Sequence, residues 1–295
     1  MLPLPLFQKP SAIVRAALWM SASALGYGAS AVMVRYLTKT MPVFEIAFVR
    51  NVFALLFMLP WLMRVGLGAL RTDHPGRHMV RGAFSAINVW FLFGALALAP
   101  VADVAAVSFL MPVVGSIFAV LFLKEVSSGR IWGATFIGFL GAVIVIRPGM
   151  ESFNLGLIFA LVSVFAGSTV AILIKSLLRT DLPDTVAAYL FIWHTLFSIV
   201  PAIVVWQTPS LVELFWCAML GLFATMIQRC FNRSMALADA TVVLPFNFSR
   251  LIWAALFGFI AFAEVPDLWT WVGGLVIFAS SIYITRFGMR RNPPV

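Results

Sequence analysis

The chain has 295 residues, of which 62% are apolar and 11% are charged, and its formal net charge is +9 at pH 7. So few charges exclude a soluble globular domain, and long continuous apolar runs exclude an outer-membrane β-barrel, whose strands alternate. A nucleic-acid-binding protein is excluded as well, because the basic residues lie between the apolar runs instead of forming one stripe.

Ten apolar segments are predicted to be membrane-spanning helices, since each approaches the roughly 20 residues that a bilayer requires. They cover residues 12–36, 43–63, 79–99, 102–123, 130–147, 154–174, 184–206, 211–234, 240–263 and 267–286. Most of the short breaks between them contain proline or glycine, and no internal segment is long enough for a soluble domain. The predicted fold class is an all-α membrane protein with ten transmembrane helices.

The distribution of basic residues predicts the orientation of these helices. If both termini are cytoplasmic, fifteen Lys and Arg residues lie at or near the inner face, and only Arg35, Lys39 and Arg147 lie outside. This bias follows the positive-inside rule. We therefore expect a multi-pass protein of a bacterial inner membrane, and labelling of a cysteine at Val295 only from outside would contradict this topology.

Part of the chain occurs twice. Residues 95–147 align with residues 234–286 without a gap, and the rare residues match, with Glu125 on Glu264, Trp132 on Trp271 and Arg147 on Arg286. Five predicted spans separate the copies, so corresponding helices cross the membrane in opposite directions. The sequence predicts two inverted five-helix repeats, residues 1–150 and 151–295, an arrangement that supports alternating access.

The repeated run resembles the EamA-type repeat of the drug/metabolite transporter superfamily. The resemblance is carried by Pro112, by Glu125 and by the glycines of the fifth span, Gly133, Gly138 and Gly141. The second copy keeps Glu264, Gly273 and Gly274, but has Leu251 in place of the proline.

The resemblance implies a secondary transporter that moves small amphipathic metabolites by alternating access. Efflux of amino acids or related compounds is favoured, and uptake of a cofactor-like metabolite such as S-adenosylmethionine or riboflavin is the alternative. The expected partners are a small-molecule substrate and the lipid bilayer, with no nucleic acid, and the expected state is a monomer or weak dimer.

Polar side chains within the spans are candidate substrate-binding residues, because polar groups at membrane depth are costly. Span 8 places Thr225, Gln228, Arg229 and Asn232 on one helical face. The full candidate set is Arg250, Asn247, Gln228, Asn232, Thr225, Asn88, Ser85, Arg50 and Asn51.

Several of these candidates have structural alternatives. Arg229 would snorkel to the inner face, Asn88 and Asn247 would form interhelical hydrogen bonds, and Arg50 would pair with Glu45. Arg250, near the middle of its predicted span, is expected to hold a substrate carboxylate. The alternative is that it bonds carbonyl groups near Pro245.

The titratable residues indicate neither an enzyme active site nor a proton relay within the membrane. No catalytic, metal-binding or cofactor-binding motif is found, so an intramembrane enzyme is the rival class rather than the prediction. All eleven acidic residues fall in loops or at span ends, which favours facilitated or exchange transport, with proton coupling through His194 as the runner-up. Glu125 and Glu264 are expected to face helix N-termini, and His74 and His78 to lie in a loop.

Overall fold

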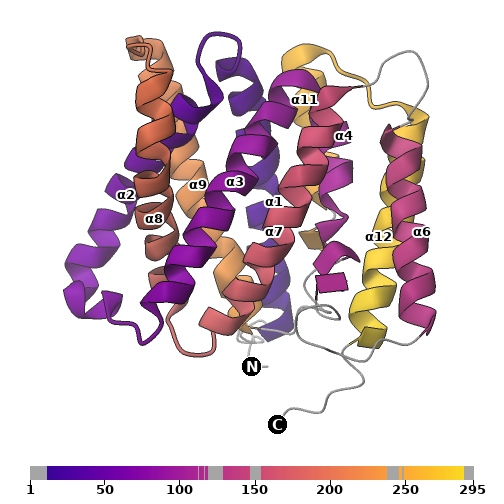
Figure 1. The fold of residues 1–295 in the computed structure, drawn as a ribbon, viewed down its shortest axis with the longest axis horizontal. Helices are drawn as coiled ribbons and strands as arrows, with labels where there is room; N and C mark the ends of the chain where they lie inside the picture. The colour runs from indigo at the N-terminus through magenta and orange to yellow at the C-terminus, as the bar shows by residue number, and fades with distance from the viewer. Residues whose placement is uncertain are drawn as a thin grey trace, which may run out of the picture.

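The computed structural model describes residues 12–111, 113–115, 117–118, 129–146, 154–237, 246–247 and 249–288, and none of these residues is in a strand. The helices stand side by side in one bundle, and α1 begins at the same edge of the bundle at which α12 ends (Figure 1). Their bounds are α1 Ala12–Leu37, α2 Val43–Val65, the 3₁₀ turn η1 Leu67–Leu70, α3 Pro75–Leu98, α4 Val101–Ser108, α6 Gly129–Ile146, α7 Leu155–Leu177, α8 Pro183–Val204, α9 Leu211–Leu237, α11 Ser249–Phe262 and α12 Leu268–Gly288.

The helices follow the predicted spans, and the protein is all-helical as expected. Within the described ranges, six helices are long and apolar enough to cross a membrane on their own, namely α1, α2, α3, α7, α8 and α9. Shorter apolar helices, α4, α6, α11 and α12, lie in the other four predicted spans.

The span predicted over residues 102–123 is not one uninterrupted helix. α4 ends at Ser108, a turn follows at Phe109 and Leu110, and helical geometry resumes at Met111. Pro112 lies outside the described residues, but a proline at this position has no N–H to donate, and its ring is incompatible with a helical carbonyl four residues earlier. The position of the break therefore follows from the sequence.

The helix predicted from residue 79 begins earlier, at Pro75, with His74 as its N-cap. Proline is well suited to the first turn of a helix, because the N–H that it lacks would have no partner there. The loop assignment of His78 is therefore wrong, since His78 is a buried residue of α3.

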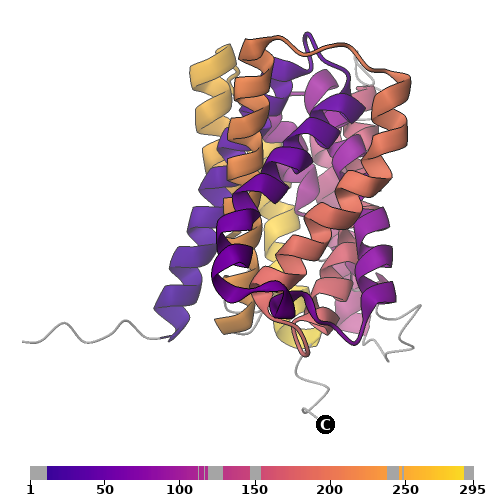
Figure 2. The same ribbon diagram turned by 90° about the vertical axis from the view of Figure 1, so that its left-hand side faces the viewer.

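Three helix pairs form the main contacts of the bundle: α3 with α7, α1 with α9, and α6 with α12. On the side of the molecule shown in Figure 2, α2 packs across α8 and α9. The α6–α12 seam is close enough that a Cβ added at Gly273 would lie 2.6 Å from the carbonyl oxygen of Gly141. Small residues of this kind allow membrane helices to approach backbone to backbone.

Polar contacts join α1, the segment after α11 and the start of α4 at one end of the bundle. Arg35 of α1 lies 2.6 Å from Glu264, whose other carboxylate oxygen accepts a 3.2 Å hydrogen bond from the backbone N–H of Val101. Glu264 thus meets a helix N-terminus as predicted, but the helix is α4 rather than the one that follows it. Glu125 lies outside the described residues.

Candidate functional site

A cavity of about 190 Å³ lies between helices α1, α2, α3, α7, α8 and α9. Five of the residues singled out from the sequence line it together: Arg50, Ser85, Asn88, His194 and Gln228. They come from four helices, so the fold gathers side chains that are up to 178 positions apart in the chain. No Asp or Glu of the described residues lines this cavity.

Many polar atoms around this cavity are buried without a hydrogen-bond partner in the part of the chain that the structure describes. They are Tyr27 Oη, Ser30 Oγ, Arg50 Nε, Arg81 Nε and Nη2, Ser85 Oγ and His194 Nε2. Leaving one such group unpaired costs about 1–3 kcal/mol. The cavity is therefore suited to a ligand, or to water, that supplies the missing partners.

Arg50 faces this cavity from α2. Its guanidinium donates a 2.6 Å hydrogen bond to Asn51 and lies 5.1 Å from the ring centre of Phe93. It does not pair with Glu45, whose carboxylate instead accepts a 3.1 Å hydrogen bond from the backbone N–H of Gln207. The alternative interpretation of Arg50 as the partner of Glu45 is thus wrong, because Arg50 bonds Asn51 and Glu45 bonds the loop after α8.

The polar face predicted on span 8 is divided between the cavity and helix packing. Gln228 lines the cavity and donates to Asn232, which in turn donates a 2.9 Å bond to the carbonyl of Pro183. Thr225 donates to the carbonyl of Ala54 at 3.2 Å. Thr225 and Asn232 hold α9 against α2 and α8, so Gln228 is the member of this face that lines the cavity.

Arg229 has a structural partner. Its Nε and Nη2 atoms lie 2.9 and 3.0 Å from the two carboxylate oxygens of Asp184, and Arg233 reaches the same carboxylate at 3.2 Å. Bidentate arginine–carboxylate pairs of this geometry are among the stronger polar contacts in proteins. This pair joins α9 to the beginning of α8.

Asn88 forms the interhelical hydrogen bond considered for it, and its contact with a substrate stays a prediction. It lines the cavity and also donates a 2.6 Å hydrogen bond to the carbonyl of Ser163 on α7. Gly167 makes this approach possible, since a Cβ added there would lie 2.8 Å from the Asn88 amide nitrogen. Asn88 is therefore held in a fixed orientation at the cavity wall.

Arg250 and Asn247 do not line the described cavity. Arg250 lies in the first turn of α11, with its guanidinium 3.5 Å from the ring centre of Tyr27 and its Nε atom buried without a partner among the described residues. Tyr27 does line the cavity. Arg250 is thus one side chain removed from it, and its predicted contact with a substrate carboxylate stays a prediction.

Two polar residues of the cavity escaped the sequence analysis: Ser30 and Arg81. Arg81 was counted among the basic residues near the inner face, yet it is only 1% exposed and donates a 2.7 Å hydrogen bond to the carbonyl of Val186. Its spacing to Ser85 and Asn88, four and seven residues, places all three on one helical face. That spacing was the available signal.

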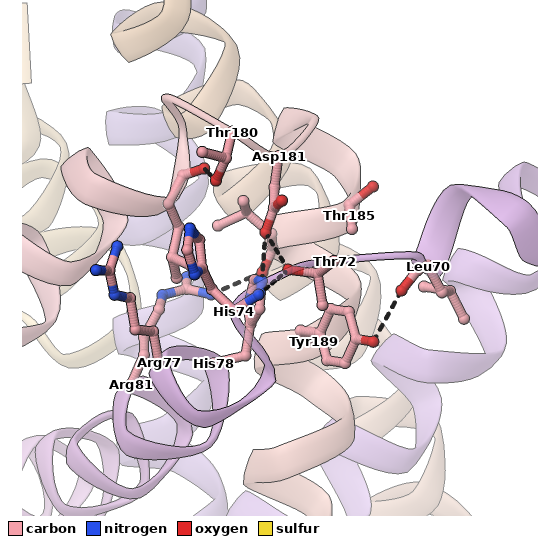
Figure 3. A network of polar contacts seen from close by, with 12 residues as sticks. Leu70, Thr72, His74, Arg77, His78, Arg81, Thr180, Asp181, Thr185 and Tyr189 are labelled. Atoms are coloured by element: carbon pink, nitrogen blue, oxygen red, sulfur yellow. Dashed lines mark hydrogen bonds and ion pairs between the residues drawn. The ribbon is translucent and has the colours of Figure 1, made fainter.

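A second polar cluster lies beyond Arg81, at the end of the bundle where α3 begins (Figure 3). His78 Nε2 is 2.7 Å from Asp181 Oδ2, which also accepts a 2.8 Å bond from Thr72, and the His78 ring stacks on Tyr189 with ring centres 4.3 Å apart. Tyr189 donates to the carbonyl of Leu70 at 2.8 Å. The cluster fixes the α2–α3 connection against the α7–α8 turn.

In the described ranges, no group of three or more His, Cys, Asp and Glu residues is arranged to hold a metal ion.

Comparison with known proteins gives a consistent result. The chain matches the EamA-like transporter family over residues 14–147 and again over residues 154–286. It is 30% identical to the S-adenosylmethionine uptake transporter of Rickettsia bellii, over 90% of this chain and 91% of that protein. It is also 30% identical to the riboflavin transporter of Rhizobium johnstonii, over 96% and 95%. One crystal structure with 18% identity superposes with a TM-score of 0.66 over 94% of this chain and 99% of that chain, which indicates a shared fold.

Proposed function

The chain belongs to the EamA-like transporter family, and from this premise we propose that it takes up a cofactor-like metabolite with a flat heterocyclic ring. Membership makes it a multi-pass membrane transporter rather than an enzyme. The proposal adds the solute class, the direction, a bacterial inner membrane as the location, and the central cavity as the binding site.

The observation that carries this proposal is the set of unpartnered polar atoms around one cavity. Tyr27, Arg50, Ser85 and His194 each contribute a buried polar atom that has no partner in the described part of the chain. A solute with several hydrogen-bonding groups would satisfy these atoms on binding. The rings of Tyr27 and Phe93 also line the cavity and suit a planar ring, since aromatic surfaces stack favourably.

The names of the relatives support uptake of a cofactor-like solute more than efflux of amino acids. One similar protein is a transporter for S-adenosylmethionine uptake and another is a riboflavin transporter, and each match covers at least nine-tenths of this chain. Both solutes carry a heteroaromatic ring and a polar chain. We therefore place the uptake alternative first and amino-acid efflux second.

Transport by this route requires the helices around the cavity to move. A volume of about 190 Å³ is below the roughly 300–1,000 Å³ of pockets that enclose drug-sized ligands. We infer that the described state is contracted, and that rocking of the two halves about the cavity widens it toward one side at a time.

Uptake by proteoliposomes tests this proposal. Vesicles containing the purified protein should accumulate radiolabelled riboflavin or S-adenosylmethionine unchanged, and Arg50→Gln should reduce accumulation about tenfold, because a hydrogen bond to a charged group contributes about 1.5–3 kcal/mol. Arg64→Gln is the matched control, since Arg64 is an exposed residue on the same helix. If the vesicles accumulate neither riboflavin nor S-adenosylmethionine, or if Arg50→Gln accumulates as much as the unmodified protein, the proposal is overturned.

A further inference from the structure

Arg81 is a buried cation without a counter-ion among the described residues. Its side chain is 1% exposed, and only Nη1 has a partner, the carbonyl of Val186, whereas Nε and Nη2 have none. Arginine stays protonated in proteins, and an isolated buried charge is strongly unfavourable. Because Arg81 lines the cavity, a ligand there is placed to compensate this charge.

Two described carboxylates at this end of the bundle, Asp181 and Asp184, are bound by residues other than Arg81. Asp181 is bound by His78 and Thr72, at the first turn of α3. Asp184 is bound by Arg229 and Arg233. Neither carboxylate therefore neutralises the charge of Arg81, and this charge is available to a group bound in the cavity.

A second arginine lies at the opposite end of the same cavity. Arg50 contacts Phe93, which is twelve residues after Arg81 on α3, so the backbone positions of Arg81 and Phe93 are about 18 Å apart at roughly 1.5 Å per residue. Ser85 and Asn88 line the wall between them. The cavity is thus a path with a cationic group at each end and no carboxylate from the described residues along it.

We propose that Arg81 and Arg50 make this cavity a charge filter, which binds neutral or anionic solutes through acceptor oxygens and excludes solutes with a net positive charge. The planar guanidinium of Arg81 is suited to a carbonyl pair, a carboxylate or a phosphate at one end of the solute. The inference rests on the proposed function and narrows it. An uncharged ring system with carbonyl acceptors fits the filter, and a sulfonium cation does not.

One matched pair of solutes isolates the charge. S-adenosylhomocysteine differs from S-adenosylmethionine by one methyl group and one positive charge, and a unit charge about 6 Å from a guanidinium changes binding roughly a hundredfold at an effective dielectric constant of about 20. We expect the purified full-length protein to bind the homocysteine compound at least about tenfold more tightly in equilibrium dialysis at low salt.

The variants assign this preference to Arg81. Arg81→Gln should remove most of the preference and Arg81→Lys should keep it, because lysine retains the charge. Arg77→Gln is the control, as Arg77 lies one turn earlier on α3, is exposed, and bonds Ser176 outside the cavity. Equal or tighter binding of S-adenosylmethionine by the unmodified protein, or an undiminished preference in Arg81→Gln, overturns the filter. If Arg81→Gln does not fold, the same binding preference is measured in the unmodified protein and in Arg50→Gln. The filter is then overturned if the unmodified protein lacks the preference or if Arg50→Gln keeps it undiminished.

A charge-graded mixture separates this inference from the proposed function. Proteoliposomes are given equal numbers of cationic, neutral and anionic metabolites, and their contents are identified by mass spectrometry. Accumulation of neutral and anionic solutes without any heteroaromatic cofactor would support the filter and contradict the proposed function. Accumulation of heteroaromatic cations would do the reverse, and no accumulation at all would count against both.

Discussion

At the scale of single residues, arginines that look alike in the sequence differ in their partners. Arg229 is bonded through two nitrogens to Asp184, whereas Arg50 lines the cavity with Nε unpaired among the described residues. We expect Arg229→Gln to weaken folding by about 1–3 kcal/mol, seen as a lower midpoint of thermal unfolding, and to leave solute affinity unchanged. Asp184→Asn should cause a similar loss, and the double variant should be little worse than either. A large change in solute affinity in Arg229→Gln would show that the pair is part of the binding site.

The stacking of Arg250 on Tyr27 gives a second test. If Arg250 acts by holding Tyr27 at the cavity, Arg250→Ala and Tyr27→Ala should each weaken solute binding, and the double variant should match the worse single variant, because both remove one contact. If Arg250 instead binds a substrate carboxylate directly, Arg250→Ala should affect carboxylated solutes far more than neutral ones. Isothermal titration with one solute of each kind distinguishes the two.

The sequence identified polar residues by their rarity in apolar spans, and Arg50, Ser85, Asn88 and Gln228 of that set line the cavity, while their contact with a substrate stays a prediction. It could not separate Gln228 from Thr225, since both lie on one helical face and only the neighbouring helices decide which side chain meets a carbonyl and which meets a cavity. Arg81 was missed for a related reason. A basic residue near a span end is usually explained by topology, and burial depends on packing that no local pattern reveals.

At the scale of helices, the glycine contact between α6 and α12 predicts a sharp difference between two similar substitutions. A Cβ at Gly273 would lie 2.5 Å from Val145 Cγ2 and 2.6 Å from the Gly141 carbonyl oxygen, so backbone must shift. Gly273→Ala should lower the thermal unfolding midpoint. Gly133→Ala meets nothing within 4 Å and should leave the midpoint unchanged or raise it, because alanine favours a helix by about 1 kcal/mol. Equal effects of the two substitutions would show that the seam does not limit stability.

The positions of the helices were predictable because apolar length and proline placement are local properties. The early end of α4 follows from Pro112 in the same way, although the continuous apolar run concealed it. The inverted relation of the halves stays a prediction. It agrees with the packing. In the predicted repeat α3 corresponds to α9 and α7 corresponds to α1, and the contact of α3 with α7 is matched by a contact of α9 with α1.

At the scale of the whole molecule, the distribution of titratable groups bears on energy coupling. No carboxylate of the described residues lines the cavity, which favours facilitated or exchange transport, and His194 is the titratable imidazole at its wall. We expect solute entry into proteoliposomes to cause no proton movement, measured with an internal pH-sensitive dye. Proton movement abolished by His194→Ala would support coupling through that residue. Proton movement that survives His194→Ala would contradict both ideas and direct attention to the His78–Asp181 pair.

The polar contacts at the two ends of the bundle define which loops share a face of the membrane. Thr72 bonds Asp181 at one end, and the carboxylate of Glu45 accepts a bond from the Gln207 backbone at the other. The positive-inside rule assigns the first end to the cytoplasm. The loop after α2 is therefore expected inside the cell, and the loop after α8 outside it.

Two introduced cysteines test this orientation. Asp73→Cys should react with a membrane-impermeant maleimide only after the cells are permeabilised, and Thr208→Cys should react in intact cells. Both positions are exposed, and the native Cys217 and Cys230 are buried, so each new thiol provides the signal. The opposite labelling pattern would invert the whole molecule in the membrane. The end of the cavity that holds Arg81 would then face outward, and an imported solute would meet that arginine first.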